Sequence, residues 1–152
     1  MPHALKEKNS NATQYSYNMI MSNIPDFSGR TVLAVDDVPV NVILLKTILT
    51  RIKASTVTAS NGKEALEALD KVRPDLILLD LRMPVMDGFE FLSRIKNSDM
   101  ADIPVVIVSA FTAQTDIDRA MGLGAADFIQ KPVIMGQLIE CIGKHLNAQG
   151  QE

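Results

Sequence analysis

Three carboxylic acids and one amine stand where short apolar runs end. Asp36 and Asp37 follow one run, Asp80 follows a second, and Lys131 closes a third. If these runs are parallel strands of one sheet, their carboxyl ends share an edge, and the four side chains meet in one pocket. Clustered carboxylate oxygens suit Mg²⁺, and an ammonium beside the cation suits a phosphoryl group. The spacing therefore predicts a site for Mg²⁺ and a phosphoryl group.

Short apolar runs alternate with helical periodicity from Gly29 onward. Strands are expected at 31–35, 55–59, 75–79, 103–108 and 126–129. Each is followed by a predicted helix, the second ended by Pro74 and the last two spanning 113–121 and 133–146. Strands as apolar as 76–79 must be covered on both faces, which parallel sheets with helical crossovers provide. We predict an α/β fold with a doubly wound parallel sheet of (βα)5 topology.

One domain is expected to account for most of the chain. At 152 residues, with 47% hydrophobic and 22% charged residues, the sequence is ordinary for a globular protein. Residues 1–28 lack periodicity apart from short apolar stretches, so we expect a flexible N-terminal arm there. The sequence supports two interpretations of this arm equally: a leader or linker, and a docking segment. The domain is expected over 29–148, with a C-terminal tail over 149–152.

Charge and cysteine content exclude several classes of function. The net charge of −3 and the lack of a Lys or Arg run argue against nucleic-acid binding. No apolar run reaches the length of a membrane span or a signal-peptide core. The single Cys141 cannot form an internal disulfide and is expected to be an inert buried thiol, while His3 and His145 show no partner pattern. We expect a cytoplasmic protein without nucleic-acid or membrane partners.

Four motifs occur in a fixed order, each at the end of a different expected strand. They are Val35-Asp36-Asp37, the run Leu79-Asp80 through Met83-Pro84 to Asp87-Gly88, Val108-Ser109-Ala110, and Phe128 to Lys131-Pro132. Together they resemble the response-regulator receiver domain of two-component and phosphorelay signalling, as in chemotaxis regulators, over about Thr31 to Asn147. The resemblance implies a flavodoxin-like sheet of five parallel strands in the order 2-1-3-4-5.

The resemblance implies a role for each carboxylate. Asp80 would accept a phosphoryl group from a phosphohistidine and form an acyl phosphate, as carboxylate nucleophiles do. Asp37 would bind Mg²⁺ directly, Asp36 would act largely through a bound water, and the backbone carbonyl of Arg82 would add an oxygen. Asp80 itself would complete the metal site, so phosphorylation would depend on a divalent cation. The protein would be a phosphoacceptor that catalyses only its own phosphoryl transfer, and not an enzyme.

The resemblance also implies a two-state switch. Lys131 and Ser109 would contact the phosphoryl oxygens, and the bond before Pro132 matches a position of a cis peptide. Phe128 stands where the family carries its switch aromatic, and it would move together with Ser109. The charge added at Asp80 would thereby bias an existing conformational equilibrium.

Arg82 and Phe111 depart from the most familiar forms of the pattern. They follow Asp80 and Ser109 by two residues each, and both are expected to line the mouth of the site. Bulky groups there would hinder an attacking water. We therefore expect a relatively long-lived acyl phosphate.

The expected partners are proteins. The sequence shows no phosphoacceptor-histidine helix and no ATP-binding segment, so a histidine kinase or a histidine phosphotransfer protein would supply the phosphoryl group. Only 147–152 follow the last expected helix, too few residues for an output domain. The signal would leave by contact with a downstream protein or by a phosphorylation-dependent dimer. By analogy, the contact surface lies around 116–121 and 128–136.

Several alternatives stay open. A single Asp at a strand end is often a helix N-cap, and only the combination of motifs argues against coincidence. The run Asp37 to Leu45 is similar to receivers of hybrid kinases or cyclic-dinucleotide enzymes, which leaves a receiver fragment excised from a hybrid kinase or multidomain regulator as one alternative. An aspartate-nucleophile phosphatase is another, although it typically carries a second Asp where Arg82 stands. A purely structural interaction module is the third.

Overall fold

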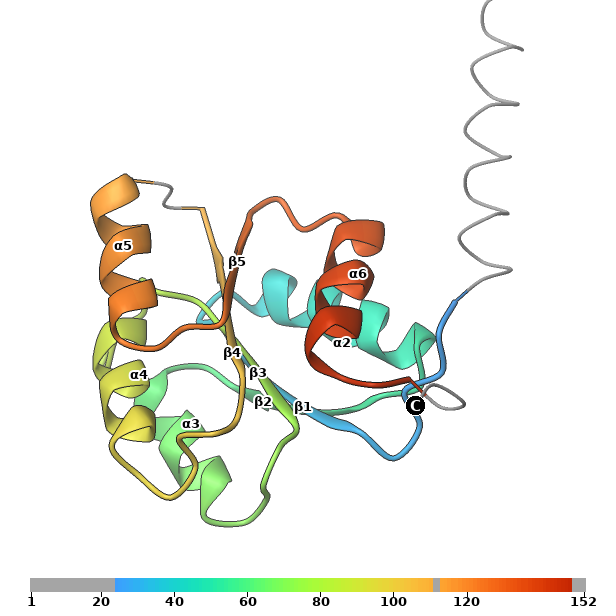
Figure 1. Ribbon diagram of the computed structural model, residues 1–152, viewed down its shortest axis with the longest axis horizontal. Helices are drawn as coiled ribbons and strands as arrows, with labels where there is room; N and C mark the ends of the chain where they lie inside the picture. Colours follow the sequence, from blue (N-terminus) through green and yellow to red (C-terminus); the bar gives the residue numbers. More distant parts are fainter. Residues whose placement is uncertain (1–23, 111–112, 149–152) are drawn as a thin grey trace, which may run out of the picture.

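Five parallel strands form one sheet within the part of the chain that the computed structural model describes, residues 24–110 and 113–148. Along the sheet they stand in the order β2-β1-β3-β4-β5 (Figure 1). Their bounds are β1 Thr31–Val35, β2 Ser55–Ala59, β3 Leu76–Leu79, β4 Val105–Ser109 and β5 Asp127–Gln130. The predicted fold class and strand order are confirmed.

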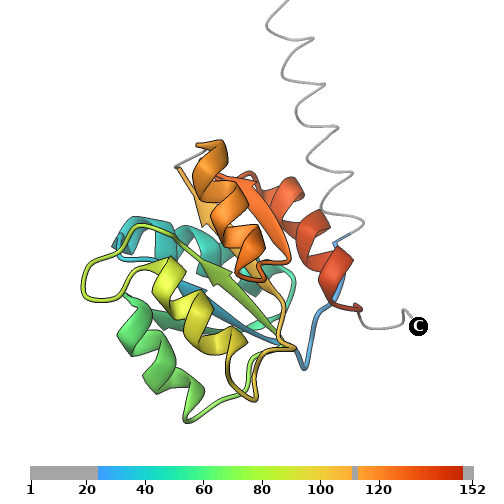
Figure 2. The same cartoon turned by 60° about the vertical axis from the view of Figure 1, so that its left-hand side comes forward.

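A helix follows each strand, and the helices form two layers around the sheet (Figures 1 and 2). In Figure 1, α3, α4 and α5 lie on one side of the sheet and α2 and α6 on the other. Each layer packs its apolar side chains into a separate core cluster. The bounds are α2 Pro39–Arg51, α3 Gly62–Leu69, α4 Gly88–Lys96, α5 Gln114–Gly122 and α6 Met135–His145.

The central strands are buried on both faces, which explains why their sequences are apolar without interruption. In β1, Val32 and Ala34 belong to the core cluster under α2 and α6, whereas Leu33 and Val35 belong to the cluster under α3, α4 and α5. The same alternation holds in β3 and β4. Full burial of a Val or Leu side chain contributes roughly 1.5–3 kcal/mol, so both layers hold the strands in place. The strand ends are therefore fixed relative to one another.

Some element ends differ from the sequence-based expectation. The helix predicted to end at Pro74 ends at Leu69, because the N–H groups of residues 70–72 turn back onto carbonyls of the last helical turn. The last helix begins at Met135 rather than at position 133, because the backbone of Ile134 is still extended. The remaining ends shift by no more than two residues.

The segment before β1 packs onto the sheet. Phe27 is buried, and its N–H donates to the carbonyl oxygen of Ile52 at 2.8 Å. Residues 1–23 of the expected arm and 149–152 of the expected tail lie outside the described residues, so the division into arm, domain and tail stays a prediction. Within the described ranges, no helix combines the length and the apolar character needed to span a membrane.

Candidate functional site

The structure brings the three predicted carboxylates together at the carboxyl edge of the sheet. Asp36 and Asp37 follow β1, and Asp80 follows the neighbouring strand β3. One carboxylate oxygen of each residue lies within 4.8 Å of the other two. Asp36 and Asp80 are buried and Asp37 is half-buried. The predicted convergence of these side chains is therefore present.

Lys131 reaches the same site from β5, two strands away from β3. Its Nζ lies 2.6 Å from Oδ2 of Asp36 and 3.6 Å from Oδ2 of Asp80. The backbone holds this position, since the Lys131 N–H donates to the carbonyl oxygen of Ser109 at 2.9 Å. The bond between Lys131 and Pro132 is cis, in agreement with the expected position. The ammonium thus bridges two of the three carboxylates.

The pKa of Asp80 is raised to about 6 in this pocket. Burial is the largest cause, and the neighbouring charges of Asp36 and Asp37 add to it, whereas Lys131 opposes it. Three carboxylates facing one ammonium leave the pocket with an excess of negative charge and of oxygen ligands. This donor set fits a hard divalent cation such as Mg²⁺.

The loop that joins Asp80 to α4 depends on Gly88. A Cβ atom at this position would overlap the Asp80 carbonyl oxygen and lie 2.8 Å from the Leu81 Cα. The Gly88 N–H donates to the Leu81 carbonyl at 2.9 Å, which folds the loop back under the site. Asp87 then caps α4, because its Oδ1 accepts the Glu90 N–H at 2.9 Å. Only glycine allows this close return of the chain.

The N-cap alternative does not describe the carboxylates after β1. The N-cap residue of α2 is Val38, and no side chain caps this helix. Oδ1 of Asp36 accepts the Val38 N–H at 2.9 Å in a short turn, which leaves its Oδ2 to Lys131. Helix capping therefore does not explain why carboxylates stand at these two positions.

Of the remaining predicted residues, the structure describes Ser109 and Phe128. Ser109 is fully buried at the end of β4, between the strands that carry Asp80 and Lys131. Phe128 is half-buried and packs against the core cluster under α3, α4 and α5. Phe111 lies outside the described residues.

Arg82 extends toward α5. Its guanidinium NH2 lies 3.1 Å from Oδ2 of Asp116, and 54% of its side chain is exposed. Its backbone N–H interacts with the Asp80 carboxyl and lowers the pKa of that group, against the larger effect of burial. Arg82 thus links the loop after Asp80 to α5, a contact that the sequence did not indicate.

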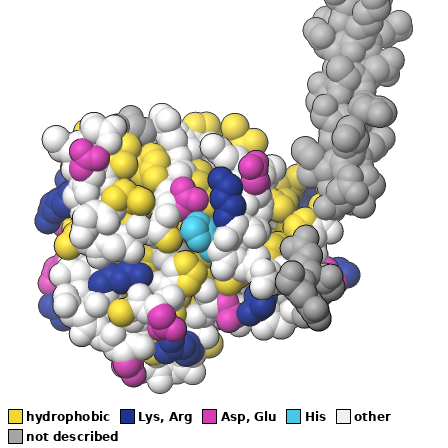
Figure 3. Space-filling view, in the orientation of Figure 1, with side chains coloured by type: hydrophobic (Ala, Val, Ile, Leu, Met, Phe, Trp, Pro, Cys, Tyr) yellow, Lys and Arg dark blue, Asp and Glu magenta, His cyan; other side chains and the backbone are white. Residues whose placement is uncertain are grey.

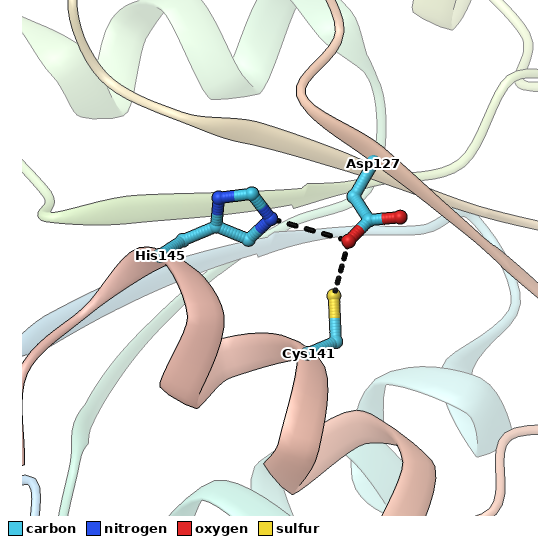
Figure 4. Close-up of side chains that lie close together, drawn as sticks. All are labelled: Asp127, Cys141 and His145. Carbon is cyan, nitrogen blue, oxygen red and sulfur yellow. Dashed lines mark hydrogen bonds and ion pairs between the residues drawn. The ribbon is translucent and has the colours of Figure 1, made fainter.

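The structure shows a second cluster of polar and sulfur-containing side chains that the sequence analysis did not predict. Asp127 lies 3.2 Å from His145 and 3.4 Å from Cys141, measured from its Oδ2 to Nε2 and Sγ (Figure 4). Cys141 is buried as expected, and burial, followed by the charge of Asp127, raises the pKa of its thiol to about 12. His145 does have a partner. Its spacing of four residues from Cys141 on one helix was the signal available in the sequence.

Comparisons with known proteins agree with this geometry. The sequence matches the family model of the response regulator receiver domain over residues 32–143. The polar-differentiation response regulator DivK of Brucella anthropi is 33% identical over 118 residues, which cover 77% of this chain and 96% of DivK. Sporulation initiation phosphotransferase F of Bacillus subtilis is 36% identical over 115 residues, covering 76% of this chain and 92% of that protein.

A solved structure shows the same architecture. The receiver domain of the sensor histidine kinase PA1611 from Pseudomonas aeruginosa, with a magnesium ion coordinated in its active-site cleft, matches with a TM-score of 0.72 and 25% identity. The match covers 78% of this chain and 98% of that chain. Other curated relatives are longer proteins, of which the chain spans 21 to 31%. Because the family match covers most of the sequence, the chain belongs to the response regulator receiver domain family.

Proposed function

We propose that Asp80 is the phosphoacceptor of a two-component or phosphorelay system. The observation that carries this proposal is the convergence of Asp36, Asp37, Asp80 and Lys131 at one edge of the sheet. An Asp80 oxygen attacks the phosphorus of a phosphohistidine, the O–P bond forms, and the N–P bond breaks. The histidine keeps the proton on its other ring nitrogen and leaves as a neutral imidazole, and an acyl phosphate remains on Asp80.

Mg²⁺ is the proposed cofactor of this site. Asp37 and Asp80 would hold it directly, Asp36 largely through water, and the Arg82 backbone carbonyl would add a ligand. When bound, the ion supplies the positive charge that offsets the clustered carboxylates and the phosphoryl oxygens. The raised pKa of Asp80 and the magnesium-bound receiver of the related kinase support this assignment.

Lys131 and Ser109 are proposed to read out the phosphoryl group. Lys131 now contacts Asp36 and Asp80, so a phosphoryl oxygen on Asp80 would fall within reach of the same ammonium. The buried Ser109 at the end of β4 would donate its hydroxyl to the phosphoryl group, with Phe128 repacking on the neighbouring strand. This pair of movements constitutes the proposed switch.

Arg82 and Phe111 are proposed to slow hydrolysis of the acyl phosphate by hindering an attacking water. The exposed guanidinium of Arg82, tied to Asp116, is the structural support for this role. The hydrolysis rate should rise when Arg82→Asn is combined with Phe111→Ala. An unchanged rate would eliminate the idea.

An apolar surface beside the site is proposed to receive the phosphodonor protein. Val40 and Ile43 of α2 are 68% and 63% exposed, and Ile134, directly before α6, is 63% exposed. A pocket of about 80 Å³ lies between these elements, lined among others by Asp36, Leu44 and Lys131. A histidine kinase or histidine phosphotransfer protein that packs on this surface would bring its phosphohistidine to Asp80. The downstream partner would use residues 116–121 and 128–136.

The central experiment is incubation with a small phosphodonor such as acetyl phosphate, followed by intact mass measurement. We expect the mass of one added phosphoryl group in the presence of Mg²⁺, with none in EDTA and none in Asp80→Asn. Steady turnover of a phosphomonoester would instead favour an aspartate-nucleophile phosphatase. A protein that takes up no phosphoryl group would be an interaction module.

A second experiment addresses the donor surface. Val40→Asp and Ile43→Asp should slow phosphorylation by a phosphorylated histidine phosphotransfer protein without changing phosphorylation by acetyl phosphate. Lys46→Ala, on the same helix and also exposed, is the matched control. Equal slowing with both donors would mean that the substitutions damage the site itself.

A further inference from the structure

Asp127, Cys141 and His145 point toward one another from two different elements (Figure 4). Asp127 is the first residue of β5, and the other two lie one helical turn apart near the end of α6. One carboxylate oxygen, the Sγ atom and a ring nitrogen all lie within 4.8 Å of one another. Strand and helix thus hold three different ligand types around one point.

Two distances in this cluster are close to those between neighbouring ligand atoms around a metal ion. Zinc binds oxygen, nitrogen and sulfur ligands at ~2.0–2.3 Å, which places neighbouring ligand atoms of a tetrahedron ~3.3–3.7 Å apart. The Asp127 oxygen lies 3.4 Å from Sγ of Cys141 and 3.2 Å from Nε2 of His145. Small side-chain adjustments would therefore be enough to receive an ion.

The donor set also selects the kind of ion. A thiolate and an imidazole favour borderline transition metals such as Zn²⁺ over Mg²⁺ or Ca²⁺, which prefer oxygen. Asp127 adds a carboxylate oxygen, which zinc sites also accept.

Solvent reaches the cluster from one side. The side chains of His145 and Asp127 are 20% and 33% exposed, while Cys141 is 5% exposed. Figure 3 shows a histidine side chain at the surface, where it lies among acidic and basic side chains and is open to solvent. An ion can enter past the two polar residues and meet the sulfur at the inner end.

We propose that Asp127, Cys141 and His145 form a binding site for one divalent transition metal ion of the Zn²⁺ class, with water as the fourth ligand. On binding, the thiol releases one proton to solvent, and the thiolate, the neutral imidazole and the carboxylate donate to the ion. The bound ion joins β5 to α6 beside Phe128. The site is separate from the carboxylates at the opposite edge of the sheet. Metal binding here therefore does not depend on the proposed phosphorylation.

The test is titration of the full chain with Co²⁺, the spectroscopic substitute for Zn²⁺, in the presence of excess Mg²⁺. A thiolate-to-cobalt charge-transfer absorption should saturate at one equivalent, and Zn²⁺ should displace it. The same absorption is expected in Asp80→Asn. Zn²⁺ affinity, measured by competition with a chromophoric chelator, should fall at least about ten-fold in His145→Ala and in Asp127→Asn. Cys141→Ser should abolish the charge-transfer band.

Matched variants separate this site from adventitious binding. The chain has two histidines, so His3→Ala should bind as the wild type does. Glu140→Gln, an exposed change beside Cys141, should also be neutral. His145→Ala alters a partly exposed side chain, and its circular dichroism spectrum verifies folding. The proposal is overturned if no charge-transfer band forms, or if Zn²⁺ affinity in folded His145→Ala equals that of the wild type.

Discussion

The two side-chain clusters of this protein lie at opposite edges of one sheet and differ in how the chain builds them. Asp36, Asp37 and Asp80 follow the carboxyl ends of their strands, where neighbouring parallel strands bring loop residues together. Asp127 begins β5 and meets the side chains of α6 through helix packing. The first cluster is uniform and acidic, whereas the second mixes oxygen, nitrogen and sulfur. Topology alone creates the first; the second also requires a particular orientation of one helix.

The reactivity of Cys141 is the largest difference that we expect between folded and unfolded protein. Its thiol pKa of about 12 leaves ~10³-fold less thiolate at pH 8 than an ordinary cysteine has. Alkylation of the metal-free folded protein by iodoacetamide should be slower by about that factor than alkylation in denaturant. Folded protein that reacts at the rate of the unfolded chain would show that the second cluster does not bury its sulfur.

Two glycine substitutions test how tightly the chain packs in the Asp80 loop and in α6. Gly88→Ala should destabilise the protein by about 3 kcal/mol, because the new Cβ would overlap backbone atoms of Asp80 and Leu81. Gly143→Ala lies in α6 with nothing within 4 Å of the added Cβ, so it should stabilise by about 0.5–1 kcal/mol. Urea denaturation measures both. Equal effects would mean that the Asp80 loop is looser than the structure shows.

Lys131→Ala should separate the functions of the two clusters. Loss of the ammonium that faces Asp36 and Asp80 is expected to slow phosphorylation by acetyl phosphate about 10²-fold. His145→Ala should leave that rate within about two-fold of the wild type, since His145 lies at the other edge. Intact mass at successive times gives both rates. A strong effect of His145→Ala would reveal coupling across the sheet.

Asp80→Asn should stabilise the metal-free protein at pH 7.5. The pKa of Asp80 is about 6 in the folded state and near 3.8 when unfolded, so its ionisation opposes folding. The contribution of the protonated Asp80 carboxyl to folding stability is fully present below pH 3.8 and is lost as the pH rises through 6. In EDTA, we therefore expect a gain of about 1 to 3 kcal/mol at pH 7.5 that vanishes near pH 4.

Excess Mg²⁺ supplies the control for this stability measurement. With Mg²⁺ bound, the wild type should become more stable than Asp80→Asn, because the ion stabilises only the protein that retains all three carboxylates. A wild type that is more stable than Asp80→Asn in EDTA would contradict the proposed repulsion.

The fold and the first cluster could be predicted because their signals are local. Apolar runs such as Leu76 to Leu79 identify a doubly covered strand, and parallel topology then fixes the edge at which Asp80 must lie. Element ends were less predictable: the helix expected to reach Pro74 stops at Leu69, because a turn competes with the last helical hydrogen bonds.

The second cluster could not be derived from the sequence. Cys141 and His145 share a helix face, but their contact with Asp127 depends on how α6 rotates and slides over β5. Many side chains together determine that packing, and no short motif records it. The pairing of Arg82 with Asp116 escaped prediction for the same reason, because it joins a loop to a helix 34 residues away.

That pairing makes the proposed switch sensitive to ionic strength. The 3.1 Å contact between Arg82 and Asp116 tethers the Asp80 loop to α5. An exposed ion pair contributes ~0–1 kcal/mol, and dissolved salt weakens it. Any rearrangement of α5 that breaks the tether would become up to about five-fold more populated in concentrated salt, even before a phosphoryl group arrives. The conformational equilibrium of the unphosphorylated protein would then depend on the ionic composition of the solution, in addition to its dependence on phosphorylation.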